Sequence, residues 1–325
     1  MKIVRAFKTG IAAILASVMV CGAAAAFPDK PLKLIVPWAA GGGTDATGRI
    51  VSQMLEAKLG QPVNVINRTG GGGVIGHDEI ARSAADGYTL GVLTSELSVY
   101  HWLGQSTVSY KDFDLIGLYN IDPQAIHVAK GSKYADLKVL ADALRNDPAS
   151  VKVGGASRGG TNHLSYISFL KAIGAEAEKA NWIPTEGAAP ALQLLTSGAI
   201  DVVIVNLPEA RALVDAGEVV AVASFGDERG KLFQDVPTVA ELVGSSIPIR
   251  TWRGIGAPKG VPAEVRSKLV DALEEIVQSP EFVELMDRRQ FTPVWLDAND
   301  FTEYLAGRDT AFGDAAKAAG LAQAQ

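Results

Sequence analysis

Hydrophobic residues occur along the chain in two alternating patterns, short continuous runs and helical spacing. Continuous runs over residues 32–37, 63–67 and 88–94 predict buried strands. Between them, apolar residues recur every three or four positions, which predicts one helix over 50–59 and another over about 75–84. Strands that alternate with helices in this way are typical of α/β proteins, in which helices cover both faces of a parallel sheet.

The same alternation continues through the rest of the chain. Further strands are expected over residues 125–129, 151–154, around 183, 200–205, 219–224 and 250–256, and further helices over 162–173, 188–196, from 262 and from 299. The pattern therefore predicts two α/β units of similar size.

The N-terminus has the features of a secretory signal peptide. Three basic residues precede an apolar run that is too short to span a bilayer comfortably, and an Ala-x-Ala series follows at 24–26. We expect cleavage of residues 1–26 before Phe27 and a periplasmic location. A short N-terminal anchor is one alternative. A lipoprotein acylated at Cys21 is another, although the residue before Cys21 is not small.

Composition excludes several classes of protein. The chain has 325 residues, of which 48% are hydrophobic, enough for two domains with real cores. Its only long apolar run is at the N-terminus, which excludes a polytopic membrane protein. The formal net charge of −6 argues against nucleic-acid binding. The single cysteine excludes a disulfide framework and a zinc site built on several thiolates.

Two glycine-rich loops, 41–43 and 70–73, each lie between a predicted strand and a predicted helix. Their spacing fits dinucleotide-binding loops, but the strand after the first loop ends in Asn67-Arg68, without the acidic residue that would bind a ribose. Helix N-termini carry unpaired N–H groups, and glycine lets a ligand approach the backbone closely. We therefore interpret both loops as a cradle for a small carboxylate, with tight structural turns as the alternative, and predict no cofactor.

A third loop, 155–159, fits G-x-S-x-G, the nucleophile elbow of hydrolases, with Ser157 as the nucleophile. Such enzymes place their histidine after the acid, towards the C-terminus. The only histidine after Ser157 is His163, six residues on, which leaves an exported esterase as the less favoured alternative. The loop also begins a helix, where Arg158 could bind a carboxylate through its planar guanidinium unless it is a solvated surface residue.

Other polar residues carry weaker signals. The four histidines are not spaced as metal ligands, so structural or surface roles are expected and no metal site is indicated. Asp45 and Arg49 are four residues apart on the first predicted helix. They form either an ion pair at the helix start or part of a pocket rim.

Several motifs together resemble a known family. They are Phe27-Pro28-Asp29-Lys30-Pro31, the run from Val36-Pro37-Trp38 to Thr44-Asp45, Asn67-Arg68-Thr69 with the glycines that follow, Asp86-Gly87-Tyr88-Thr89-Leu90, Gly159-Gly160-Thr161-Asn162-His163, Pro190 to Gly198 with Asp201, Trp252-Arg253-Gly254, and Ala257-Pro258-Lys259-Gly260. As a set they resemble the Bug family, the periplasmic substrate-binding receptors of tripartite tricarboxylate transporters, over the whole mature chain.

The resemblance implies a two-lobed periplasmic binding fold of the flytrap type. The first lobe would comprise 27–123 plus 248–325 and the second 124–247. Because two chain passages join the two predicted α/β blocks, we expect the lobes to close on the ligand about hinges near 123–127 and 246–251. The ligand would lie between the lobes, one carboxylate held by the first-lobe loops and the other end read by the second lobe.

The resemblance also implies a set of ligand-binding residues and no catalytic ones. They are Trp38, Ala39, Gly42, Gly43, Thr44, Asp45, Gly72, Gly73, Val74, Thr94, Ser157, Arg158, Thr161, Asn162, Thr185, Glu186, Gly187 and Asn206. Thr185-Glu186 departs from the family pattern of an aromatic and a basic or small residue before Gly187. If Glu186 faces the pocket, the distal group of the ligand would be hydroxyl, amide or amine. The alternative is that Glu186 points to solvent.

The favoured function is that of a monomeric, non-catalytic receptor that passes a small organic carboxylate to the membrane subunits of a tripartite tricarboxylate-type transporter. The alternatives are the exported esterase and a ligand-binding module that feeds a signalling system. The sequence does not separate transport from sensing.

Overall fold

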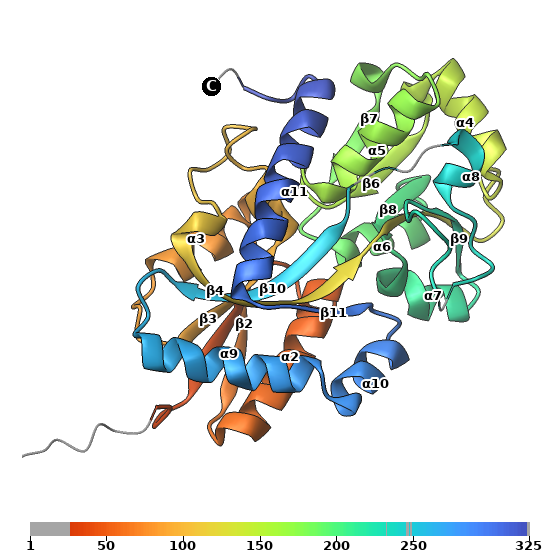
Figure 1. The fold of residues 1–325 in the computed structure, drawn as a ribbon. Helices are drawn as coiled ribbons and strands as arrows, with labels where there is room; N and C mark the ends of the chain where they lie inside the picture. The colour runs from red at the N-terminus through yellow and green to blue at the C-terminus, as the bar shows by residue number, and fades with distance from the viewer. Residues whose placement is uncertain (1–26, 232, 245–246, 248, 324–325) are drawn as a thin grey trace, which may run out of the picture.

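Two mixed β-sheets, each flanked by helices, form the two lobes of the protein (Figure 1). The computed structural model describes residues 27–231, 233–244, 247 and 249–323. The predicted signal peptide, with Cys21, lies outside these residues. Within them, no helix is both long and apolar enough to cross a membrane.

The first lobe is built on a six-stranded sheet in the order β11-β4-β10-β3-β1-β2. Its strands are β1 (Leu32–Val36), β2 (Val63–Asn67), β3 (Thr89–Thr94), β4 (Phe113–Asp122), β10 (Thr251–Pro258) and β11 (Pro293–Leu296). One face packs against α2 (Gly43–Leu59), α9 (Ala263–Val277) and α10 (Pro280–Arg288), and the other against α3 (Val74–Arg82) and α11 (Ala298–Ala318).

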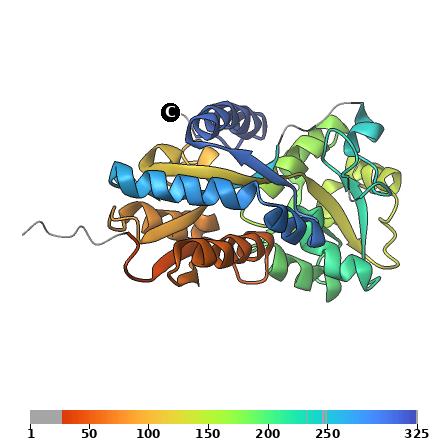
Figure 2. The ribbon, with the colours of Figure 1, turned by 60° about the horizontal axis from the view of Figure 1, so that its bottom comes forward.

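The second lobe is built on a five-stranded sheet in the order β7-β6-β8-β5-β9. Its strands are β5 (Gln124–Ala129), β6 (Lys152–Gly155), β7 (Asn181–Pro184), β8 (Val202–Asn206) and β9 (Val219–Ser224). Its helices are α4 (Leu137–Asn146), α5 (Thr161–Ala172), α6 (Ala188–Thr196), α7 (Arg211–Asp215) and α8 (Val239–Val243). Figure 2 shows the two lobes side by side.

The α/β class and two-lobed fold are confirmed, but the expectation of parallel sheets is wrong. β1 pairs with β2 and β3 in parallel, whereas β10 lies antiparallel between β3 and β4. In the second sheet, β5 is antiparallel to both β8 and β9. The chain leaves the first sheet at the end of β4 and re-enters it at the start of β10. Both strands are antiparallel to the strands beside them.

Local signals predicted most helix ends and strand positions well. Gly60 ends α2 in the left-handed conformation, with φ of 70°, and its N–H donates to the carbonyl of Glu56. Several elements have no counterpart in the sequence prediction, among them β4, α4, α7, α8 and α10. Asp136 caps α4 by accepting hydrogen bonds from the N–H groups of Lys138 and Val139, a local signal that the apolar pattern alone does not show.

The long C-terminal helix α11 contacts both lobes (Figure 1). Its first half packs Phe301 and Leu305 into the core of the first lobe. Its second half packs Phe312 and Ala316 into the core of the second lobe. The lobe boundaries 27–123 plus 248–325 and 124–247, and the hinges, stay predictions.

Candidate functional site

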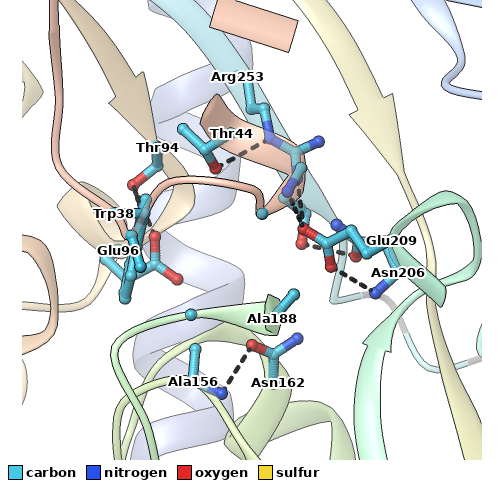
Figure 3. Close-up of a pocket in the computed structure, with 15 residues that line it drawn as sticks. Trp38, Thr44, Thr94, Glu96, Ala156, Asn162, Ala188, Asn206, Glu209 and Arg253 are labelled. Atoms are coloured by element: carbon cyan, nitrogen blue, oxygen red, sulfur yellow. Dashed lines mark hydrogen bonds and ion pairs between the residues drawn. The ribbon is translucent and has the colours of Figure 1, made fainter. Parts of the chain in front are cut away.

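A cavity lies between the lobes where strands of both sheets end and three helices begin (Figure 3). Trp38 and Ala39 follow β1, Thr94 ends β3 and Asn206 ends β8. The lining residues are Trp38, Ala39, Gly42, Gly43, Thr44, Thr94, Glu96, Ala156, Asn162, Gly187, Ala188, Asn206, Glu209, Thr251 and Arg253. Strand ends of this kind are the usual place for ligands in α/β folds.

The helices α2, α5 and α6 begin at this cavity with glycine at the N-cap. Gly42, Gly160 and Gly187 precede their first turns, and none of these turns has a side-chain cap from its own N-cap residue. The first N–H groups of each helix therefore have no acceptor within the helix and carry partial positive charge. Gly187 has a φ of 130°, a conformation that other residues rarely adopt.

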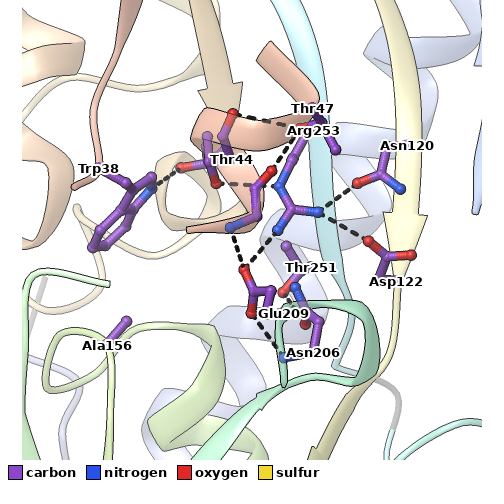
Figure 4. A network of polar contacts seen from close by, with 12 residues as sticks. Trp38, Thr44, Thr47, Asn120, Asp122, Ala156, Asn206, Glu209, Thr251 and Arg253 are labelled. Carbon is purple, nitrogen blue, oxygen red and sulfur yellow. Dashed lines mark hydrogen bonds and ion pairs between the residues drawn. The ribbon is translucent and has the colours of Figure 1, made fainter. Parts of the chain in front are cut away.

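Arg253 on β10 holds a buried ion cluster at the back of the cavity (Figure 4). Its guanidinium donates to Asp122 Oδ2 at 2.9 Å and to Glu209 Oε1 at 3.1 Å. It also donates to Asn120 at 2.5 Å and to Thr44 Oγ1 at 3.1 Å. Arg253 and Asp122 are each 1% exposed.

The electrostatic balance of this cluster is set by burial. Burial raises the pKa of the Asp122 carboxyl and that of Glu209, and the charge of Arg253 offsets part of the rise in both. A single cation, Arg253, is thus paired with two buried carboxyl groups, so the cluster has no excess positive charge that could bind an anionic ligand.

Three glutamates reach across the cleft to the glycine loops of the opposite lobe. Glu209 of the second lobe accepts a hydrogen bond from the N–H of Gly43 in α2 at 3.1 Å. Glu186 accepts from the N–H of Gly70 at 3.0 Å. Glu96 of the first lobe accepts from the hydroxyl of Thr161 at the start of α5, at 3.0 Å. Carboxylates of the protein itself therefore occupy positions that the sequence analysis assigned to a ligand carboxylate.

A second, more open cavity forms the mouth of the cleft. It is lined by Gly71, Gly72, Val74, Gln105, Ser157, Arg158, Pro184, Thr185 and Glu186. The loops touch here, because a Cβ added to Gly72 would lie 2.6 Å from that of Ser157. Arg158 and Glu186 are exposed at this mouth and do not line the central cavity.

Comparison with known proteins decides the family. A model described as the tripartite tricarboxylate transporter family receptor matches residues 47–321. The chain belongs to this receptor family. It is 33% identical to the protein BugT of Bordetella pertussis over 274 residues, which cover 82% of each chain.

Solved structures agree with this assignment. The receptor matches the periplasmic binding protein BugD with a TM-score of 0.85 at 26% identity, over 92% of this chain and all of that one. It also matches an R. palustris protein solved with adipate, with a TM-score of 0.85 at 27% identity, over 91% of this chain and 99% of that one. The Bug-family resemblance read from the sequence is thus confirmed.

The structure distributes the predicted binding residues of the receptor over three places. The central cavity includes Trp38, Ala39, Gly42, Gly43, Thr44, Thr94, Asn162, Gly187 and Asn206. The mouth includes Gly72, Val74, Ser157, Arg158, Thr185 and Glu186. The residues that line neither are Asp45, Gly73 and Thr161. Ligand contact by any of them stays a prediction.

Asp45 forms an ion pair and hydrogen bonds within the first lobe. It forms an ion pair with Arg49 at 2.9 Å and accepts hydrogen bonds from Gly41 N–H and the Asn67 amide. Although burial acts to raise its pKa, these hydrogen bonds lower it. This arrangement fits the simpler of the two interpretations, an ion pair at a helix start.

Sequence reasoning missed six lining residues, namely Glu96, Ala156, Ala188, Glu209, Thr251 and Arg253. Arg253 stood within a family motif, Trp252-Arg253-Gly254, which was a usable signal. Glu96 and Glu209 lie in short 3₁₀ segments, Ser95–Ser98 and Leu207–Ala210, and nothing in the local sequence marks their side chains as facing a cavity.

The hydrolase interpretation of Ser157 finds no support in the described geometry. His163 accepts a hydrogen bond at Nδ1 from the N–H of Gly159 at 3.0 Å, and its ring lies against Trp182 with centroids 4.8 Å apart. Its exposed fraction is 2%. The histidine that the motif would need is thus a buried structural residue.

Gly43 is the position in α2 where a side chain is excluded. A Cβ there would lie 2.4 Å from Glu209 Oε1 and 2.8 Å from Arg253 Nη2. We expect Gly43→Ala to lower the free energy of unfolding by about 1–3 kcal/mol, because the buried cluster must move apart. Gly42→Ala is the matched control, since its Cβ would meet nothing closer than 3.5 Å. Urea unfolding measures both, and equal stabilities would contradict the steric argument.

Proposed function

We propose that this receptor is exported to the periplasm, with residues 1–26 removed, and binds a small organic carboxylate between its lobes. It then presents the ligand, as a monomer without catalysis, to the membrane subunits of a tripartite tricarboxylate-type transporter. The observation that carries this proposal is a cavity between two lobes on which three helix N-termini converge, in a chain of this receptor family.

The chemistry of the cavity supports a carboxylate ligand. Gly187 and Ala188, where α6 begins, line the cavity, and their N–H groups donate to no glutamate in the described part of the chain. Carboxylates bind well to such groups. The structurally similar R. palustris protein was solved with adipate, itself a carboxylate.

A thermal-shift screen against a panel of carboxylates tests the proposed function. A ligand at 100 times its dissociation constant adds about 2.7 kcal/mol to the free energy of unfolding. For a chain of this length we expect a rise in melting temperature of about 5–10 °C. If no mono-, di-, tri- or aminocarboxylate raises the melting temperature, the proposed function is wrong.

A further inference from the structure

The central cavity has more negative than positive charge. Arg253 is the only lysine or arginine among its lining residues, and its guanidinium is already bonded to Asp122 and Glu209. Glu96 adds a second carboxyl group to the lining, besides that of Glu209. A ligand with two or three carboxylates would therefore bring further negative charge into an enclosed space in which every cation is engaged.

Glu96 is buried beside the cavity without a counter-charge. It is 5% exposed, and none of the ion pairs in the described part of the chain includes it. Its Oε2 accepts a hydrogen bond from Thr94 Oγ1 at 2.7 Å, and its Oε1 accepts one from Thr161 Oγ1 at 3.0 Å. A buried carboxylate with only neutral partners is costly unless a cation binds beside it.

The neighbouring groups hold Glu96 as an acceptor. Trp38 Nε1 donates to Thr94 Oγ1 at 3.3 Å, so the threonine hydroxyl directs its own hydrogen at Glu96 (Figure 3). On the other side, the hydroxyls of Ser95 and Thr161 lie 2.6 Å apart, and the second of them donates to Glu96. Each carboxylate oxygen has a second lone-pair position, which leaves room for donors from a ligand.

Glu96 and the start of α6 thus offer opposite chemistry to the cavity. The start of α6, at Gly187 and Ala188, offers N–H donors to a carboxylate. Glu96, on the first lobe, offers a fixed carboxylate. We propose, on the basis of the function proposed above, that the ligand is a small carboxylic acid that also carries a protonated amine, with the amine bound to Glu96 and the carboxylate bound at the start of α6.

Isothermal titration with matched ligands tests this proposal. The panel pairs β-alanine and γ-aminobutyrate with succinate and glutarate, and with propionate and butyrate, so that chain length varies separately from the terminal group. We expect the best aminocarboxylate to bind the wild-type protein at least about 10-fold more tightly than any dicarboxylate or simple acid. A dicarboxylate or simple acid that binds most tightly overturns the proposal and leaves the proposed function standing. If no member of the panel binds, this proposal is overturned, and the broader thermal-shift screen decides the proposed function.

The variant Glu96→Gln assigns the selectivity to one residue. Glutamine keeps the shape and an acceptor oxygen but removes the charge, so affinity for the best aminocarboxylate should fall by about 10- to 100-fold. Affinity for the simple acid of the same length should change little, which separates lost charge from a disturbed site. Glu264→Gln is the control, because this glutamate is exposed on α9 and lines neither the central cavity nor the mouth of the cleft. Equal losses for both ligands in Glu96→Gln would overturn the assignment to Glu96.

Discussion

Replacing Arg253 by methionine should cost about 3–5 kcal/mol of stability. The guanidinium is the partner of two buried carboxyl groups, Asp122 and Glu209, and both would lose the cation that they share. Leaving a buried charge unpaired is more damaging than removing an ion pair as a whole. For a chain of this length the melting temperature should fall by roughly 6–20 °C.

A matched exposed arginine provides the control for this result. Arg288 pairs with Glu284 in α10, and the two side chains are 69% and 64% exposed. Arg288→Met should therefore cost no more than about 1 kcal/mol. Adding Asp122→Asn and Glu209→Gln to Arg253→Met should restore part of the lost stability, since both buried charges are then removed. If the single variant Arg253→Met were as stable as the wild type, the two buried carboxyl groups would not depend on the charge of Arg253.

Lowering the pH from 7 to 5 should destabilise the protein through its buried histidines. Burial lowers the pKa of His77 to about 3, and burial with the nearby Arg158 lowers that of His163 to about 3. In the unfolded chain each ring has a pKa near 6.5. The unfolded state therefore takes up protons first, and stability falls as the pH drops below about 6.5. At pH 5 each ring should cost about 2 kcal/mol.

The geometry of His77 explains why it must stay neutral. Its Nε2 accepts a hydrogen bond from the N–H of Thr94 at 3.3 Å, so the ring proton is on Nδ1, which faces the Tyr100 hydroxyl at 3.0 Å. That hydroxyl in turn donates to the carbonyl of Gly72 at 2.9 Å. A second proton would break the bond to Thr94 and disturb the support of the glycine loop at the cleft mouth.

Urea unfolding of His77→Gln at both pH values isolates this contribution. The variant should lose about 2 kcal/mol less than the wild type between pH 7 and pH 5. Asp122 and Glu209 act in the opposite direction, because their raised pKa values let the folded state protonate first as the pH falls. An identical pH dependence in His77→Gln and the wild type would refute the role of His77.

The sequence by itself determined the elements whose signals are local. Apolar runs and helical spacing predicted β1, α2, β2, α3 and β3 in order. A helix or strand that is buried has apolar residues at the spacing of that element, and this spacing is visible in the sequence. Glycine loops before helices predicted where α2 and α5 begin at the cleft. The two-lobed arrangement was predicted from the family motifs, because the spacing of apolar residues does not show how the two α/β units are arranged.

Only the tertiary structure decided the charge chemistry of the cleft. The hydrogen bond between Gly43 and Glu209 joins residues that are 166 positions apart in the sequence. The one between Arg253 and Thr44 joins residues that are 209 positions apart. Glu96 finds Thr161 across the gap between the lobes. Sheet order likewise depended on β10 returning antiparallel between β3 and β4. The physical reason is that the state and partners of a buried charge depend on which distant segments exclude water around it, and no local pattern in the chain records that choice.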